Sequence, residues 1–310
     1  MSGAVGAGDG RESRLVAAAR EFRRKVYAHY RSAGRELPWR CTDDPYAILV
    51  SELMLQQTQV ERVLRYYQPF LQAFPTAARL AATTTAEVLQ LWSGLGYNRR
   101  ALALQRAAFM VVREHSGHVP SDRDSLLCLP GVGAATSGAV LAFAYRTPVV
   151  FIETNIRRAG IAELVARPSL LPVDPGEPIS DALLLPLLEH ALDRDDPRCW
   201  YYALMDYGAA LGREARRDDS APNPNLASAA YKRQSRFAGS GRQLRGAIVR
   251  ALVKSEAPKT ADELWRACRS VAPATPCARA VAAIAQLREE GLLEQVGGSQ
   301  SPMYQLPRDR

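Results

Sequence analysis

The chain has 310 residues, of which 47% are hydrophobic, and 40 Lys and Arg against 32 Asp and Glu give it a formal net charge of +8. This length and apolar content exclude a wholly disordered chain and suggest two domains with packed cores. No stretch approaches the roughly 18 uninterrupted apolar residues of a membrane span, and the small, polar N-terminus lacks a secretory signal, so we expect a cytoplasmic protein with no membrane partner.

Helical periodicity dominates the first two thirds of the sequence. Residues 1–10 are expected to form a disordered tail, and apolar residues at helical spacing predict a helix over residues 11–33. Residues 147–152 have the composition of a short strand. From Asp44-Pro45 onwards the sequence predicts helices over residues 44–74, 76–82, 85–92, 97–116, 122–128, 134–146, 153–165, 179–193 and 197–212.

These patterns predict an all-α core over residues 11–212. Residues 213–241 lose helical periodicity and predict a basic linker or extended loop. Residues 242–310 combine three short helices with a terminal hairpin, which predicts a winged-helix-like α+β module, with a dimerisation module or a purely structural cap as the alternative.

The positive charge is concentrated outside the middle of the chain. Residues 11–40 carry +6, residues 41–212 carry −4, residues 213–242 carry +4 and residues 243–310 carry +3. This distribution predicts that attraction to phosphate comes from the ends and the linker. The alternative for residues 11–40 is an amphipathic helix with a solvated arginine face.

Glu52 is the first candidate catalytic residue. On a helix it shares a stripe with Ile48, Leu49 and Leu55, where desolvation is expected to raise its pKa and keep it protonated as a general acid. The alternative is a paired structural carboxylate.

A Pro-Gly-x-Gly turn joins two predicted helices at residues 129–138. Gly131 and Gly133 allow the backbone to approach an anion, and the amides at the start of the second helix point towards it. The turn therefore predicts a grip on the DNA backbone without base readout, and an ordinary helical hairpin is the alternative.

Glu153 follows an apolar run at the start of a helix, where the helix dipole favours an ionised carboxylate. One protonated and one ionised carboxylate, with a phosphate grip between them in sequence, suit cleavage of a glycosidic bond through an oxocarbenium-like transition state. Gln56, Gln57 and Tyr97 are suited to filling the gap left by an extruded base.

Six motifs carry a family resemblance: LPWR (37–40), DPY (44–46), SELMLQQTQV (51–60), LWSGLGYNRRA (91–101), LPGVG (129–133) and ETNIRR (153–158). Together they resemble the helix-hairpin-helix DNA glycosylase superfamily, and within it the A/G-specific adenine glycosylases. The resemblance implies an all-α, two-lobed helix-hairpin-helix glycosylase fold and base excision repair on double-stranded DNA. In this fold the central helical barrel would span about residues 44–146, and the second lobe would consist of residues 11–43 plus 147–212. It implies that Glu52 protonates the departing purine, that Gln57 and Tyr97 intercalate, and that Asn155 positions the catalytic groups.

The expected catalytic residues are therefore Glu52, Glu153 and Asn155. The expected DNA-binding residues are Gln56, Gln57, Tyr97, Leu129, Gly131, Val132, Gly133, Thr136, Arg157, Arg213, Arg216, Arg217, Lys232 and Arg233.

Three departures from the family pattern refine this expectation. Ala135 stands where bifunctional relatives carry a catalytic lysine, so we expect no lysine-based AP lyase activity. Glu153 stands where the family has an aspartate, which moves the carboxylate outwards by a methylene. Residues 212–241 contain no Cys, so we expect no iron–sulfur cluster, no other cofactor and no metal, with the basic linker contacting DNA in place of the cluster loop.

We thus expect a monomeric, monofunctional DNA N-glycosylase, with adenine in a purine mispair as the leading target. A mismatched thymine or uracil, or another modified base, is the alternative within this class. A catalytically silent DNA-binding or damage-sensing protein on a glycosylase scaffold, and a winged-helix regulator, are the alternatives outside it.

Overall fold

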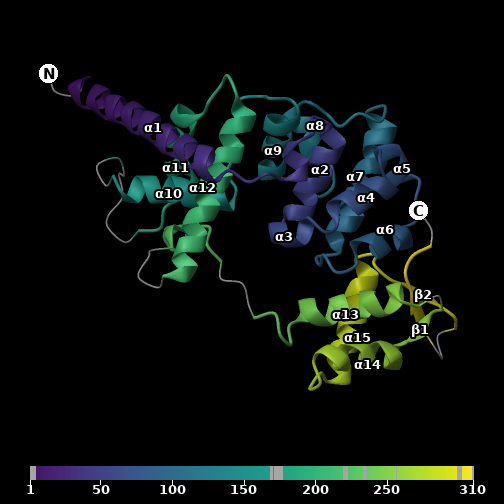
Figure 1. The fold of residues 1–310 in the computed structure, drawn as a ribbon. Coiled ribbons are helices and arrows are strands. Elements are labelled where there is room, and N and C mark those ends of the chain that lie inside the picture. Colours follow the sequence, from purple (N-terminus) through teal and green to yellow (C-terminus); the bar gives the residue numbers. More distant parts are fainter. Residues whose placement is uncertain are drawn as a thin grey trace. The chain divides into compact units, whose positions relative to one another are not determined.

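The structure is a computed structural model that describes residues 5–167, 170, 177–218, 223–232, 236–255, 257–298 and 302–308 (Figure 1). The chain forms two compact units, each discontinuous in sequence: unit 1 contains residues 1–43 and 137–233, and unit 2 contains residues 44–136 and 234–310. No helix in the described ranges is long and apolar enough to cross a membrane.

Unit 1 is built around packed helices. Its elements are α1 (Val5–Ala33), η1 (Pro38–Arg40), most of α9 (Ala134–Ala144), α10 (Thr154–Val165), α11 (Asp181–Ala191), α12 (Pro197–Arg217) and η3 (Pro224–Ala227). α12 packs along α10, and α1 packs against α11 and α12. Phe22 of α1 meets Trp200 of α12 edge to face in this core, with ring centroids 6.1 Å apart and both side chains fully buried.

Two segments of unit 1 differ from the sequence prediction. α1 begins at Val5, inside the expected tail, because adding residues to a nucleated helix costs little. Residues 147–152 form no strand, since no strand of unit 1 lies beside them in the described chain. Instead the Val149 carbonyl accepts a hydrogen bond from Tyr201 Oη at 2.8 Å, and Phe151 is buried against Gly138 of α9.

Part of the expected linker packs within unit 1. α12 continues beyond residue 212 to Arg217, and residues 224–227 form η3, which packs on α10. Asn225 is buried, and Ser228 forms a β-bridge with Ile179. This segment therefore has packing partners that a search for helical periodicity does not detect.

Unit 2 contains the helices predicted for the central barrel. They are α2 (Pro45–Leu55), α3 (Val60–Val63), α4 (Tyr67–Ala73), α5 (Ala77–Ala81), α6 (Thr85–Trp92), α7 (Arg99–Glu114) and α8 (Arg123–Cys128). α7 packs against α2, α5 and α6. Leu104, Ala107 and Val111 form part of its buried stripe, at the spacing of one helix face. The unit continues through the hairpin into the start of α9, up to Thr136.

The C-terminal module is also part of unit 2. Its elements are α13 (Gly241–Val253), β1 (Lys259–Thr260), α14 (Ala261–Val271), α15 (Cys277–Glu289), β2 (Glu294–Val296) and β3 (Met303–Gln305). β3 lies between β1 and β2 and is antiparallel to both, with Tyr304 paired to Lys259 and to Gln295. The described residues thus contain the expected helices and hairpin, with β1 as an added strand, in the order of a winged helix.

Candidate functional site

Glu52 lies on α2, a helix that is buried on nearly every side. Asp44 begins the helix, because its Oδ1 accepts a hydrogen bond from the amide of Tyr46 at 2.9 Å. Buried Ser51 and Leu53 flank Glu52, which is itself half-buried. The acid therefore lies on a largely desolvated helix, as the sequence predicted, and its raised pKa stays a prediction.

Arg100 ties the end of α2 to the loop before α7. Its guanidinium donates to six oxygen atoms at 2.5 to 3.4 Å, namely the carbonyls of Leu53, Met54, Gln56, Gly96 and Tyr97 and the hydroxyl of Thr58. The last carbonyls of a helix lack partners within it, and a buried cation satisfies them well. Burial lowers the pKa of Arg100 to about 10, which leaves it protonated at neutral pH.

Gln57 and Tyr97 have a backbone conformation that side-chain-bearing residues rarely adopt. Their φ angles are 54° and 51°. Left-handed residues other than glycine cost on the order of 1 kcal/mol and concentrate at functional loops. The Arg100 guanidinium lies 5.3 Å from the centroid of the Tyr97 ring. The two residues expected to intercalate thus lie in strained loops. Arg100 contacts both loops, since it donates to the carbonyls of Gln56 and Tyr97.

Gln56 joins the end of α2 to the hairpin. Its Nε2 donates to the carbonyl of Gly131 at 3.0 Å and to Thr136 Oγ1 at 3.1 Å. The structure therefore brings together three of the predicted DNA-binding residues. The Gln56 amide acts here as an internal brace for the hairpin.

The two hairpin glycines have different roles. Gly131 has a φ of 82°, and a Cβ there would lie 2.9 Å from Ala103 Cβ, so both its conformation and its surroundings require glycine. A Cβ on Gly133 would meet no atom within 4 Å. Gly133 therefore leaves its backbone approachable from outside, which is what a phosphate grip needs.

Leu129 and Val132 are buried, with 2% and 7% of their surface exposed. Their side chains anchor the hairpin in unit 2, so the prediction that they contact DNA is limited to their backbone groups. Apolar residues in a tight turn are held by the core beneath it, and the sequence motif alone did not separate the two roles.

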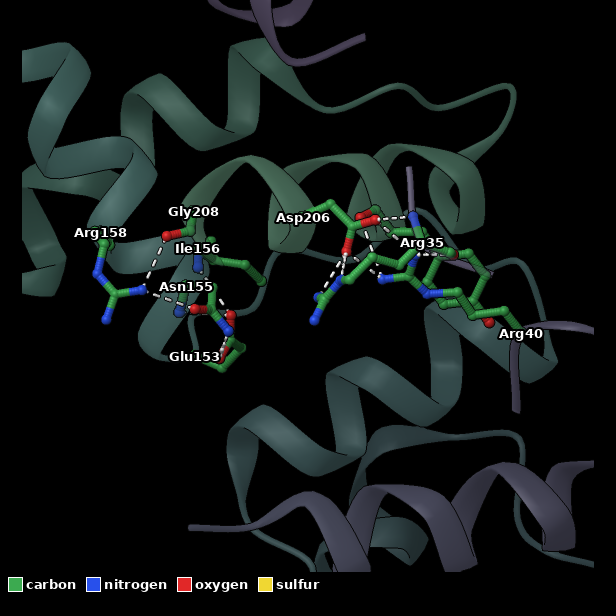
Figure 2. Close-up of polar contacts among 9 residues, drawn as sticks. Arg35, Arg40, Glu153, Asn155, Ile156, Arg158, Asp206 and Gly208 are labelled. Carbon is green, nitrogen blue, oxygen red and sulfur yellow. Dashed lines mark hydrogen bonds and ion pairs between the residues drawn. The ribbon is translucent and has the colours of Figure 1, made fainter. Parts of the chain in front are cut away.

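Glu153 caps α10 in unit 1 (Figure 2). Its Oε1 accepts hydrogen bonds from the amides of Asn155 and Ile156 at 2.7 and 2.8 Å, and its Oε2 accepts one from Asn155 Nδ2 at 3.3 Å. An N-cap carboxylate normally satisfies helix amides in this way. The extra methylene of glutamate is accommodated, because the side chain still reaches both amides.

The pKa of Glu153 is raised, although the helix start favours its ionised form. Burial is the largest cause, and the amides of Ile156 and Asn155 and the charges of Arg158 and Arg157 oppose it. The prediction considered the dipole but not the loss of hydration in the folded unit. The carboxylate thus binds its proton more tightly than an exposed glutamate does.

Arg158 links Asn155 to α12 (Figure 2). Its Nη1 donates to Asn155 Oδ1 and to the carbonyl of Gly208, both at 2.9 Å. A Cβ on Gly208 would lie 2.0 Å from the carbonyl oxygen of Asn155, so α10 and α12 approach each other where one of them has no side chain. Asn155, and through it Glu153, is therefore positioned by the packing of two helices.

A second buried cluster in unit 1 explains the LPWR motif. Asp206 is 1% exposed and accepts hydrogen bonds from Arg35 Nε at 2.8 Å and from Arg40 Nη1 and Nη2 at 2.9 and 2.8 Å (Figure 2). These arginines hold the pKa of Asp206 below its usual range, against the effect of burial. The Arg40 guanidinium also lies 4.6 Å from the centroid of the Tyr202 ring. Arg40 thus connects the segment before α2 to α12, and breaking such a pair leaves a buried charge.

The predicted basic contacts divide into two kinds. Arg157 forms a bidentate pair with Asp181, at 2.6 and 2.7 Å, which makes it an internal brace of unit 1, and its contact with DNA stays a prediction. Its sequence position beside Glu153 gave no sign of this distant partner. The remaining basic residues are exposed, with Arg213, Arg216 and Arg217 on the end of α12 and Lys232 after η3, whereas Arg233 lies outside the described residues.

Three positioning residues were not predicted from the sequence: Arg100, Arg158 and Asp206. Two of them lie inside the family motifs, at YNRRA and ETNIRR. The available signal was a charged residue within a largely apolar helix pattern, which is rare unless the charge has buried partners. Asp206 had the same signal on α12, where buried Leu204 and Ala203 precede it.

The donor set for an iron–sulfur cluster is lacking after α12. Such clusters are held by cysteine thiolates, and residues 212–241 contain none. Within the described ranges, no group of three or more His, Cys, Asp or Glu side chains is arranged to hold a metal ion. We therefore derive no chemistry from a cluster.

Residues 50–171 match the family model described as HhH-GPD superfamily base excision DNA repair protein. The chain is 37% identical to the adenine DNA glycosylase of Mycolicibacterium smegmatis over 254 residues, which are 77% of this chain and 83% of that protein. It is 35% identical to the human adenine DNA glycosylase over 207 residues, which are 64% of this chain and 37% of that protein.

Solved structures of similar fold include a thermostable thymine-DNA glycosylase, with a TM-score of 0.52, 25% identity and coverage of 66% of this chain and 88% of that one. A trapped covalent complex of endonuclease III with DNA has a TM-score of 0.51 at 21% identity, covering 62% of this chain and 84% of that chain. The second likeness concerns the fold alone.

Proposed function

Because the chain belongs to the HhH-GPD superfamily of base excision DNA repair proteins, we propose that it is a monofunctional DNA N-glycosylase that removes adenine from a purine mispair. The target is inferred from the mycobacterial and human relatives, whose name is adenine DNA glycosylase. Double-stranded DNA with a mispaired base is the proposed substrate.

Glu52 is proposed as the general acid. It lies on a helix buried on nearly every side, where the protonated carboxyl is favoured, and it is a half-buried residue whose helix end is fixed by Arg100. Protonation of the departing adenine would make the base a neutral leaving group. The position of Glu52 on this buried helix, whose end Arg100 anchors and which precedes the strained Gln57, is the single observation that carries the proposal.

Glu153 is proposed to act in its ionised form on the sugar. Its carboxylate is oriented by two α10 amides and by Asn155, so it is ready to stabilise an oxocarbenium-like transition state or to orient water. Since burial raises its pKa, the active form should be lost at a higher pH than for an exposed carboxylate. Ala135 has no amine, which favours hydrolysis without a Schiff base.

DNA is proposed to be held by the backbone of the hairpin at Gly133 and by the exposed basic end of α12. Arg213, Arg216 and Arg217 are exposed there, at the start of the cysteine-free segment. Contacts of this kind are independent of sequence and weaken as salt rises. Reversing these three charges is expected to weaken binding to every duplex by a similar factor.

Excision from defined duplexes tests the proposal. The purified protein is incubated with oligonucleotides that carry A:G, A:8-oxoguanine, T:G, U:G, hypoxanthine or alkylated bases, and the strands are analysed with and without alkali. We expect cleavage of the A:G and A:8-oxoguanine duplexes only after alkali. Glu52→Gln should lower the single-turnover rate constant by at least about 100-fold, the scale of general acid catalysis.

Glu114→Gln is the matched control, because Glu114 is an exposed residue at the end of α7. Its rate constant should equal that of the wild type. Excision without alkali would contradict the monofunctional assignment. No excision from any duplex, together with tight duplex binding, would replace the proposal with a catalytically silent damage sensor.

A mismatched thymine is the second candidate target. The fold likeness to a thymine-DNA glycosylase, at 25% identity over 66% of this chain, is the observation in its favour. Faster excision from T:G than from A:G in the same panel would select it.

A further inference from the structure

An arginine of the C-terminal module contacts Tyr97, one of the two residues predicted to intercalate. Arg242, in the first turn of α13, donates from Nη1 to Tyr97 Oη at 2.9 Å. The two residues are 145 positions apart in sequence and both belong to unit 2. Both are half-buried, so the hydrogen bond lies at the edge of the unit and not within its core.

Tyr97 is consequently held in three ways. Its backbone is left-handed, its ring is packed against Arg100, and its hydroxyl group accepts the hydrogen bond from Arg242. A ring restrained in this way has lost most of its rotamer freedom before any duplex is bound. Preorganisation of this kind improves binding because the ordering cost is not added at the moment of association.

Several contacts hold the module against the barrel near this loop. α13 contacts α6, and the amide of Ala86 in α6 donates to the Pro307 carbonyl at 3.1 Å. Glu290 accepts a hydrogen bond from Arg245 Nη1 at 2.7 Å, and its carboxylate lies 4.0 Å from Nε of Arg99. Arg99 follows Tyr97 by two residues. The module thus contacts α6 and the first residue of α7, the two helices on either side of the loop that carries Tyr97.

We propose that the C-terminal module is a support for the DNA-probing loop, and that Arg242 is a positioning residue that fixes the Tyr97 ring for insertion into the base stack. The inference rests on the proposed function. It gives the module a role in DNA recognition that acts through Tyr97 and needs no base contact from the module's own helices. The ligand recognised in this way is the stacked DNA duplex at the mispair, and Tyr97 is the residue that contacts it.

A double-mutant cycle tests the proposal in the full chain. Arg242→Gln, Tyr97→Phe and the double variant are compared by the Kd for an uncleaved A:G duplex and by the fluorescence of 2-aminopurine placed beside the adenine. Tyr97→Phe keeps the ring and removes the hydroxyl acceptor. Arg242→Gln should raise Kd about 5- to 10-fold and lower the fluorescence gain on binding, the scale of one ordinary intramolecular hydrogen bond.

The decisive result is the coupling between the two substitutions. If Arg242 acts through the Tyr97 hydroxyl group, Arg242→Gln should change Kd by less than about 2-fold when Phe already stands at position 97. An undiminished effect in that background would overturn the proposal and assign Arg242 to a direct phosphate contact. Arg242→Lys, which keeps one donor, should recover part of the fluorescence gain.

The control is Arg250→Gln on the same helix, which removes the same charge two turns further on. It should leave Kd and fluorescence unchanged, and an equal effect there would reduce the result to general electrostatics. A wild type that binds and unstacks the duplex without excising adenine would refute the proposed function and leave this inference standing.

Discussion

Replacing Arg100 by methionine is expected to destabilise the protein more than any surface substitution. Methionine retains the linear stem but removes six donated hydrogen bonds, including those to the Leu53 and Met54 carbonyls at the buried end of α2. Leaving each of these two carbonyls without a partner costs about 1–3 kcal/mol. The guanidinium is itself desolvated, as its lowered pKa shows, and removing it offsets part of this cost. We therefore expect a loss of about 2–4 kcal/mol in the free energy of unfolding.

Urea unfolding followed by circular dichroism measures this loss. The matched control is Arg113→Met on the same helix, where the side chain is 68% exposed and pairs with neighbouring Glu114. Exposed pairs contribute little, so the control should change stability by less than about 0.5 kcal/mol. If Arg100→Met falls in the same range as the control, the helix-end bonds do not stabilise α2 and the reasoning is refuted.

Three further outcomes are expected. Gly208→Ala should cost about 3 kcal/mol and impair excision, because its Cβ would lie 2.0 Å from the Asn155 carbonyl; thermal unfolding measures the first effect. Gly133→Ala should leave stability within about 0.5 kcal/mol of wild type and yet raise the Kd for duplex DNA, because the added methyl group meets only open space in the protein. Arg158→Gln should move the acidic limb of the single-turnover pH profile to higher pH, since Arg158 lowers the pKa of Glu153 and activity rises as that carboxylate ionises. An unchanged limb would show that another group controls it.

The helical framework was largely predictable because its signals are local. Asp44 and Pro45 mark the start of α2, and the apolar stripe of α7 marks its buried face. The winged-helix-like order of the module also followed from the sequence, through the turn residues between short periodic segments. Each of these features depends on residues within a few turns of each other.

The polar braces were not predictable for the opposite reason. Arg157 reaches Asp181, Arg40 reaches Asp206, and Arg100 reaches backbone carbonyls more than forty positions away. A single sequence shows which side chains can form such bonds but not which ones meet. The pKa of Glu153 depends on the same information, because burial by distant residues outweighs the helix dipole next to it.

The two candidate carboxylates are held by different devices in different units. Glu52 belongs to unit 2, on a helix whose end is fixed by Arg100 and whose following loop is braced on the hairpin by Gln56. Glu153 belongs to unit 1, where α10 amides and the Arg158 bond to α12 fix it. Each acid is therefore preorganised by its own unit, which is the condition for electrostatic catalysis without reorganisation during the reaction. A glutamate at position 153 is compatible with this arrangement, because its longer side chain still caps α10 by accepting hydrogen bonds from the amides of Asn155 and Ile156 within unit 1.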